Sequence, residues 1–206
     1  MKLYIVKGST SCRKVLATAY HLNLPLELQT IEFYSRHFDK RAFARKNPNG
    51  MVPLLEDGDF LLWESTAIMQ YLADKMPEST LFPRDFKIRA DISRWQSWAL
   101  AHFGAACDSL IWENVLKGLL EGGSPDPRKV DEATQGFLRS AAVLDHCLEG
   151  REFLVGDHVT LADFSVAATL GYAEPARILW NEFSNIKKWY ARLETLDTWK
   201  RTAPPR

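Results

Sequence analysis

The sequence has no net charge and no long hydrophobic run. Its 206 residues carry 26 basic and 26 acidic side chains, so no overall positive field attracts a polyanion, and we expect no nucleic-acid partner. The first apolar run, MKLYIV, ends at Lys7, which makes it too short for a signal-peptide core or a membrane span. We therefore expect a cytoplasmic protein without a membrane partner.

Cysteine is scarce and histidine is scattered. Cys12, Cys107 and Cys147 are odd in number, far apart and without a C-x-x-C pair, which argues against a disulfide framework and a zinc site and fits a reducing compartment. The five histidines show no metal-ligand spacing, so we expect no metal. Hydrophobic residues make up 46% of the chain and charged residues 25%, values that indicate a packed globular protein rather than a disordered chain.

The N-terminal part of the chain alternates strand and helix signals. A strand, a helix ending before Asn23 and a second strand form a crossover that gives parallel strands. Asp57-Gly58-Asp59 lies between two apolar runs, a strong hairpin signal. The predicted elements are strands at 3–6, 26–32, 52–56 and 60–64, and helices at 15–22, within 35–46, and at 65–76 with Ser65 or Thr66 as its cap.

Strand signals stop after the segment 81–85, and helical periodicity takes over. Apolar side chains recur at helical spacing from Ile88 toward Lys117 and predict one long helix. Further helices are predicted at 130–148 and 160–172, with two shorter ones near 186–193 and 198. Thr160 and Asp163 fit a capping box, which is a folding element. We predict two domains, 1–78 and 85–206, joined by a linker at 79–84.

The turn after the first strand, Gly8 to Arg13, leads into the first helix. Unpaired amides and the helix dipole favour an anion there, and a hydroxyl can stabilise a thiolate by donating a hydrogen bond. Thr10 and Ser11 also suit a simple helix cap. Cys12 is open to two interpretations, an activated nucleophile or a small buried residue. The residues alone do not choose among Ser9, Thr10, Ser11 and Cys12 as the key group.

Two further segments carry binding signals. Val52-Pro53 enters a strand, and a cis bond there would present the Val52 backbone to an extended ligand, although composition alone favours trans. Glu64-Ser65 stands at a helix start, where Ser65 could bind a carboxylate and Glu64 an ammonium group. The alternative is that Ser65 caps the helix and Glu64 interacts favourably with its dipole.

These segments together resemble the cytosolic glutathione transferases, bacterial members in particular, with similarity to the serine-type phi, theta and delta classes. The resemblance spans nearly the whole chain through four motifs in order, GSTSCRKV, NPNGMVPLLEDG, WESTAIMQYLA and FLVGDHVTLADF. It implies a thioredoxin-like α/β N-terminal domain, an all-α helical C-terminal domain, a homodimer and a cis Pro53. It also implies glutathione as co-substrate and conjugation to a small hydrophobic electrophile.

The resemblance assigns a role to each matching position. Ser9 matches the hydroxyl that stabilises the glutathione thiolate, and the Val52 backbone matches the group that pairs with the cysteinyl unit. Glu64 and Ser65 match the pair that holds the γ-glutamyl group. His37 and Lys40 fall in the segment that contacts the glycine carboxylate. For the electrophile we expect an apolar pocket on the long helix, lined by Trp98, His102, Phe103 and Trp112.

Two positions depart from the family pattern, and two alternative functions stay open. Met51 replaces a polar residue, and Asn49 stands where some classes carry an aromatic key for the partner subunit. One alternative is a glutathione-dependent isomerase or reductase acting through Cys12. The other is a noncatalytic interaction module. The absence of a cysteine at position 9 or 10 favours conjugation over reduction, and the retained Ser9 argues against the module.

Overall fold

The computed structural model describes residues 1–33 and 35–204 of the chain, so the last two residues of the predicted helical domain lie outside it. The N-terminal part contains a four-stranded mixed sheet in the order β2-β1-β3-β4. β1 pairs with β2 in parallel and with β3 antiparallel, and β3 pairs antiparallel with β4. The strands are β1 Lys2–Ile5, β2 Glu27–Thr30, β3 Leu54–Asp57 and β4 Phe60–Trp63.

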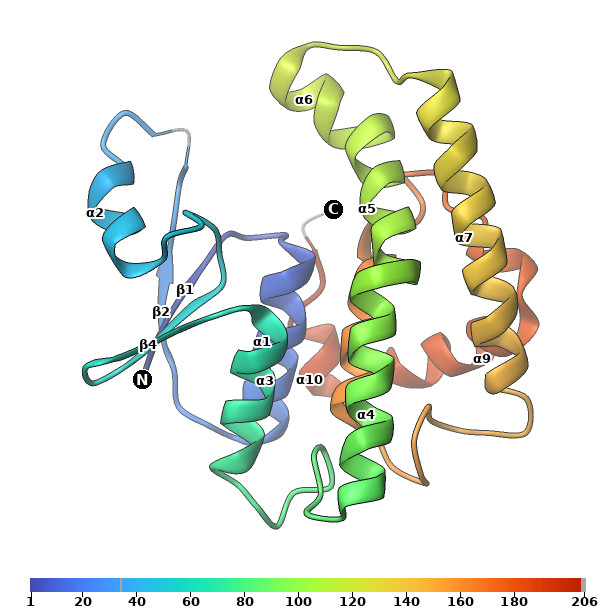
Figure 1. The fold of residues 1–206 in the computed structure, drawn as a ribbon, viewed down its shortest axis with the longest axis horizontal. Coiled ribbons are helices and arrows are strands. Elements are labelled where there is room, and N and C mark those ends of the chain that lie inside the picture. The colour runs from blue at the N-terminus through green and yellow to red at the C-terminus, as the bar shows by residue number, and fades with distance from the viewer. Residues whose placement is uncertain (34, 205–206) are drawn as a thin grey trace.

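Three helices flank this sheet. α1 and α3 lie between the sheet and the helical half of the molecule, while α2 lies on the far side (Figure 1). The inner face of the sheet is apolar, since Leu3 and Leu55, which pair across β1 and β3, are fully buried, and Leu54 is buried on the opposite face. The helices are α1 Thr10–His21, α2 Lys40–Lys46 and α3 Ser65–Asp74. The predicted strand–helix–strand crossover and the Asp57-Gly58-Asp59 hairpin are both present, with ends shifted by a few residues.

The rest of the chain is helical, as the sequence predicts. The predicted long helix is built from α4 Phe86–Trp98, η1 Ala99–Phe103, α5 Gly104–Ile111, η2 Trp112–Leu116 and α6 Lys117–Glu121. The two η segments are π-helical, a local widening that the apolar periodicity does not predict. A Cβ on Gly104 would lie 2.3 Å from the Ala99 carbonyl oxygen, so the end of the first widened turn requires glycine.

Six further segments complete the described part of the helical half. α7 Pro127–Cys147 runs beside the long helix (Figure 1). α8 carries the predicted capping box, because the Thr160 and Asp163 side chains and backbone groups bond to each other. The remaining elements are α8 Leu161–Ala168, η3 Thr169–Tyr172, η4 Trp180–Glu182, α9 Ser184–Leu193 and α10 Asp197–Lys200.

Buried polar contacts join the two halves. Gln96 on α4 accepts from Gln70 on α3 at 2.7 Å and donates to Ser165 on α8 at 3.2 Å. Arg13 on α1 stacks over the Trp199 ring, 3.8 Å from its centroid. α1 therefore contacts α3 in its own half and both α8 and α10 in the helical half, so its N-terminus and the residues next to it are held in a defined position.

Candidate functional site

Ser9 begins the helix that leads away from β1. Its Oγ accepts a hydrogen bond from the Cys12 backbone N–H at 3.3 Å, which makes Ser9 the N-cap of α1. The prediction that Thr10 or Ser11 caps this helix is wrong, because the helical backbone already begins at Thr10. The Tyr172 hydroxyl donates to the Gly8 carbonyl oxygen at 2.7 Å and fixes the preceding turn to the helical half.

Cys12 lies behind this turn and is only 1% exposed. Burial raises the pKa of its thiol, and a hydrogen bond with Ser9 only partly opposes that effect. A buried thiol with a raised pKa is a poor nucleophile because little of it is thiolate at neutral pH. The structure therefore supports the interpretation of Cys12 as a small buried residue over that of a catalytic cysteine.

A cavity of about 410 Å³ brings three distant segments together. It lies where the first turn of α1, the loop before β3 and the start of α3 meet. Val52 and Pro53 are joined by a cis peptide bond, as the family resemblance implies. Val52 precedes Leu54, the first residue of β3 that pairs in the sheet. The lining residues are Ser11, Asn47, Asn49, Met51, Val52, Pro53, Glu64 and Ser65.

Glu64 holds an unusual backbone conformation at this cavity. Its φ is 71° and its ψ 111°, a region that non-glycine residues rarely occupy and that costs on the order of 1 kcal/mol. Glu64 is the N-cap of α3 but makes no side-chain capping bond. The expected cap by Ser65 or Thr66 is therefore wrong. The first amides of α3 and the Ser65 hydroxyl are placed at the cavity to receive an anionic group.

Asn47 shapes the loop that carries Val52. It is 2% exposed, its Nδ2 donates to the Met51 carbonyl oxygen at 2.7 Å, and its Oδ1 accepts from the Asn49 N–H at 3.0 Å. Sequence reasoning missed this residue, although the run Asn47-Pro48-Asn49-Gly50 marks a turn. A turn signal indicates where a loop bends but does not show which side chain organises it.

The structure does not bring every predicted residue to this cavity. His37 and Lys40 are both exposed and do not belong to its lining. Ser9 borders a neighbouring cavity of about 270 Å³, which the buried Arg13 and the segment 201–204 also line. Ser11, one of the alternatives in the first turn, lines the same cavity as Glu64 and Ser65.

The predicted aromatic pocket on the long helix does not form as expected. Phe103 is fully buried and packs against Phe137 of α7, and Trp98 stacks on Phe103 with ring centroids 5.4 Å apart. Phe103 belongs to the hydrophobic core and the partly buried Trp98 packs against it. Neither residue lines the cavity of about 410 Å³ or the groove between α5 and α7. Phe103 is part of the apolar stripe that predicts the helix, and the structure buries it between the long helix and α7.

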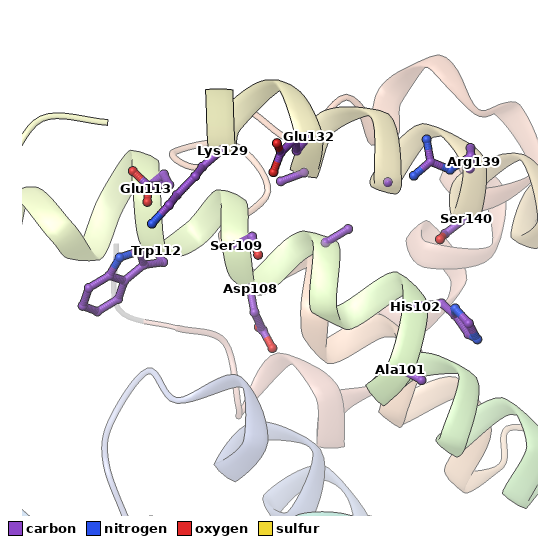
Figure 2. Close-up of a pocket in the computed structure, with 13 residues that line it drawn as sticks. Ala101, His102, Asp108, Ser109, Trp112, Glu113, Lys129, Glu132, Arg139 and Ser140 are labelled. Carbon is purple, nitrogen blue, oxygen red and sulfur yellow. The ribbon is translucent and has the colours of Figure 1, made fainter. Parts of the chain in front are cut away.

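His102 and Trp112 lie on an open groove of about 840 Å³ between α5 and α7. His102 points away from the N-terminal half, whereas Asp108 and Trp112 project from the long helix toward it (Figure 2). Trp112 is 37% exposed. Of the four predicted pocket residues, Trp112 alone combines an exposed aromatic surface with this orientation.

The described residues contain no helix that is both long and apolar enough to cross a membrane. Within residues 1–33 and 35–204, no group of three or more His, Cys, Asp or Glu side chains is arranged to hold a metal ion. The cavity lining offers the hydroxyls of Ser11 and Ser65, the Glu64 carboxylate and the side-chain amides of Asn47 and Asn49.

Comparison with known proteins agrees with this geometry. Residues 3–80 match the family model for the glutathione S-transferase N-terminal domain, and residues 127–192 match that for the C-terminal domain. The chain is 31% identical to glutathione S-transferase F6 of Arabidopsis thaliana over 93% of each chain.

Solved structures give the same result. Glutathione transferase F7 from Populus trichocarpa matches with a TM-score of 0.90 and 26% identity, covering 98% of this chain and 97% of the other. The theta class glutathione S-transferase of Xanthomonas axonopodis pv. citri, solved with glutathione bound, matches with a TM-score of 0.88 and 26% identity. The match covers 100% of this chain and 97% of the other.

Proposed function

The chain belongs to the glutathione S-transferase family, and from that premise we propose that the cavity between α1, β3 and α3 holds glutathione in an extended form. One observation carries this proposal: Ser11, Val52 and the pair Glu64-Ser65, which belong to three separate segments of the sequence, line one cavity. The γ-glutamyl carboxylate would bind the Ser65 hydroxyl and the first amides of α3. Glu64 would accept from the γ-glutamyl ammonium group.

The cysteinyl unit would pair with the backbone of Val52 in the manner of an added strand. This placement supports a thiol directed toward the first turn of α1. His37 and Lys40, exposed on the same half of the molecule, would reach the glycine carboxylate with their side chains. The extended tripeptide would thus contact all three segments of the N-terminal domain.

The reaction is transfer of the glutathione sulfur to an electrophile. The Ser9 hydroxyl, aided by the positive end of α1, would hydrogen-bond the thiolate and lower the pKa of the glutathione thiol. The thiol proton leaves to solvent, and the sulfur lone pair then forms the new bond to the electrophilic atom. In a substitution the leaving group departs with the electron pair of the bond that breaks, and in an addition the electrons of the attacked multiple bond take up a proton from solvent. No covalent enzyme intermediate is needed, and proximity of the two substrates supplies part of the rate increase.

Ser11 is a second candidate for the thiolate donor. Its favouring observation is that it lines the cavity with Glu64 and Ser65, whereas Ser9 lines the neighbouring one. Ultraviolet titration of the bound thiolate separates the two. Removal of the true donor, by Ser9→Ala or Ser11→Ala, should raise the thiol pKa by about 1–2 units. Equal titrations for both variants and the wild type would contradict both assignments.

We propose that the second substrate is a small hydrophobic electrophile bound beside Trp112. Leu116 and Leu119 are exposed on the last turns of the long helix, as Trp112 is. These three side chains support an apolar surface there. Trp112→Ala should raise the KM for apolar electrophiles and leave glutathione affinity unchanged. Unchanged KM values across an electrophile panel would place the pocket elsewhere.

We also propose that the protein forms a homodimer. Met51, Leu61 and Trp63 expose apolar surface on the N-terminal half, and an isologous pair would cover each patch with the groove between α5 and α7 of the other subunit. The groove carries both positive and negative side chains, because Lys129, Arg139 and Glu132 line it. A cytoplasmic location is part of the same proposal and is supported by three free thiols.

Calorimetric titration with reduced glutathione tests the binding site. The wild type should show saturable binding that the double variant Glu64→Ala, Ser65→Ala loses. The chain offers a matched control in Glu78→Ala, Ser79→Ala, because the same dipeptide recurs outside the cavity. Equal binding by the wild type and the Glu64, Ser65 variant would move the glutathione site away from this cavity.

A further inference from the structure

Lys14 is a buried cation that the proposed reaction does not use. It is 5% exposed and lies on α1 three residues after Ser11, which places the two on the same face of the helix one turn apart. Ser11 lines the cavity with Glu64 and Ser65, and α1 packs against α3. Lys14 does not line the cavity itself and lies one turn of α1 behind Ser11, where the charges of Glu64 and Asp108 act on it.

Two acids act on this lysine from different elements. Asp108 of α5 and Glu64 before α3 are the charges that favour protonated Lys14, against the effect of its burial. Asp108 projects from the long helix toward the N-terminal half (Figure 2), and the Lys14 charge in turn lowers the pKa of its carboxyl, which burial raises. On α1 itself, Arg13 turns away and stacks on Trp199.

The Lys14 ammonium group forms no close ion pair with the described residues. Among the side chains of residues 1–33 and 35–204, the ion pairs within 4.0 Å do not include Lys14. Asp108 and Glu64 stand far enough away to leave the cation available to a third group. A buried charge without a close partner is costly to the fold, which is typical of groups that serve a site.

We propose that Lys14 is a positioning residue of the glutathione site, where its ammonium group offsets Glu64 and Asp108 and makes the γ-glutamyl end acceptable to an anionic ligand. This inference rests on the proposed function. Glutathione carries two carboxylates and one ammonium group at neutral pH, so its net charge is negative. Without Lys14, the carboxylates of Glu64 and Asp108 would repel the negatively charged glutathione, because no nearby positive charge would offset them.

Titration with S-methylglutathione tests this role, because the blocked thiol removes the thiolate from the pH profile. The wild type should bind most tightly below about pH 8 and lose affinity as Lys14 deprotonates. Lys14→Met should bind about tenfold more weakly at neutral pH, a loss expected for one partly screened charge. Its affinity should also lack that alkaline decrease. The exposed Lys87→Met is the matched control and should behave as the wild type.

Asp108→Asn provides an independent test that leaves Lys14 itself in place. Removing this acid lowers the pKa of Lys14, so the alkaline loss of affinity should begin at lower pH. In the conjugation assay, Lys14→Met should raise the KM for glutathione while kcat stays within about twofold, because a positioning residue acts on binding.

The outcomes separate this inference from the proposed function. Equal affinity and pH profile in the wild type and a folded Lys14→Met would overturn the role of Lys14 and leave the glutathione site standing. If Lys14→Met does not fold, an unshifted profile in Asp108→Asn overturns it instead. A wild type that does not bind S-methylglutathione at all would overturn both.

Discussion

The indole Nε1 of Trp189 donates a hydrogen bond to Oδ1 of Asp163 at 2.8 Å, a contact that ties α9 to the first turn of α8. The same carboxylate accepts from the backbone N–H of Leu154 at 3.0 Å and of Thr160 at 2.8 Å. Asp163 has no exposed surface. A single side chain therefore satisfies buried donors from three segments of the helical domain.

Asp163→Ala should destabilise the protein strongly, because it leaves these donors buried without an acceptor. We expect a loss of about 3–5 kcal/mol in the free energy of unfolding, measured by urea denaturation followed by circular dichroism. The control is Asp157→Ala on the exposed loop nearby, which should change stability by less than about 0.5 kcal/mol. Equal stabilities of the two variants would show that the capping box contributes little.

The three thiols should differ in reactivity. Cys12 and Cys107 are buried, and burial raises the pKa of both, that of Cys107 to about 12. Cys147 is partly exposed. A thiol reagent should therefore modify Cys147 rapidly in the native protein and all three in denaturant, and Cys147→Ser should abolish the rapid phase.

Fast modification of Cys12 in the native protein would contradict its assignment as a structural residue and would reopen the reductase function. Conjugation activity offers a second check. Cys12→Ala should retain most of it, since the thiol lies behind the turn and is nearly closed to solvent. A loss of more than about tenfold with glutathione binding intact would point to a chemical role.

Most of the fold could be predicted because most helices and strands are marked by a motif or periodicity within their own sequence. The Asp57-Gly58-Asp59 turn and the Thr160–Asp163 box depend on neighbours in sequence, and both formed as predicted. The π-helical turns of the long helix were not predicted, because they depend on packing between distant segments. The same holds for Trp98 and Phe103, since periodicity shows that a face is apolar but not whether it is buried.

The candidate site was predicted through motifs rather than through physical derivation. The residues alone left Val52-Pro53 open between cis and trans and Glu64-Ser65 open between binding and capping. The structure gives the cis bond and a Glu64 without a side-chain cap bond. Asn47, Lys14 and Asp108 were missed because their roles arise from three-dimensional neighbours, and no spacing in the sequence marks Asp108 as close to α1.

The proposed dimer predicts that an acidic residue at an exposed apolar position separates the subunits. Met51 is 63% exposed on the loop before Val52, and Met51→Glu together with Trp63→Glu would place charges where apolar contacts are required. Light scattering after size exclusion should give twice the 23.5 kDa chain mass for the wild type and a single chain for the variant. The control is Phe86→Glu, an exposed aromatic outside the proposed contact. A monomeric wild type would contradict the proposal.

The proposed role of Lys14 also has a consequence for stability that has the opposite sign to its effect on binding. Burial lowers the pKa of Lys14 from 10.5 to about 8. Below about pH 8 the group is protonated in both states, and its burial costs about 3 kcal/mol. Between about pH 8 and about pH 10.5 the unfolded chain binds a proton that the folded chain has lost. The free energy of unfolding should therefore rise with pH across this window.

Lys14→Met removes both the cost and its pH dependence. At neutral pH the variant should be more stable than the wild type by up to about 3 kcal/mol, while binding S-methylglutathione more weakly. Urea unfolding followed by tryptophan fluorescence at about pH 7 and about pH 10 gives the difference, and the other lysines cancel because both proteins contain them. A less stable Lys14→Met at neutral pH would mean that the ammonium group stabilises the fold. Such a result would identify Lys14 as a structural residue whose burial the surrounding acids fully offset.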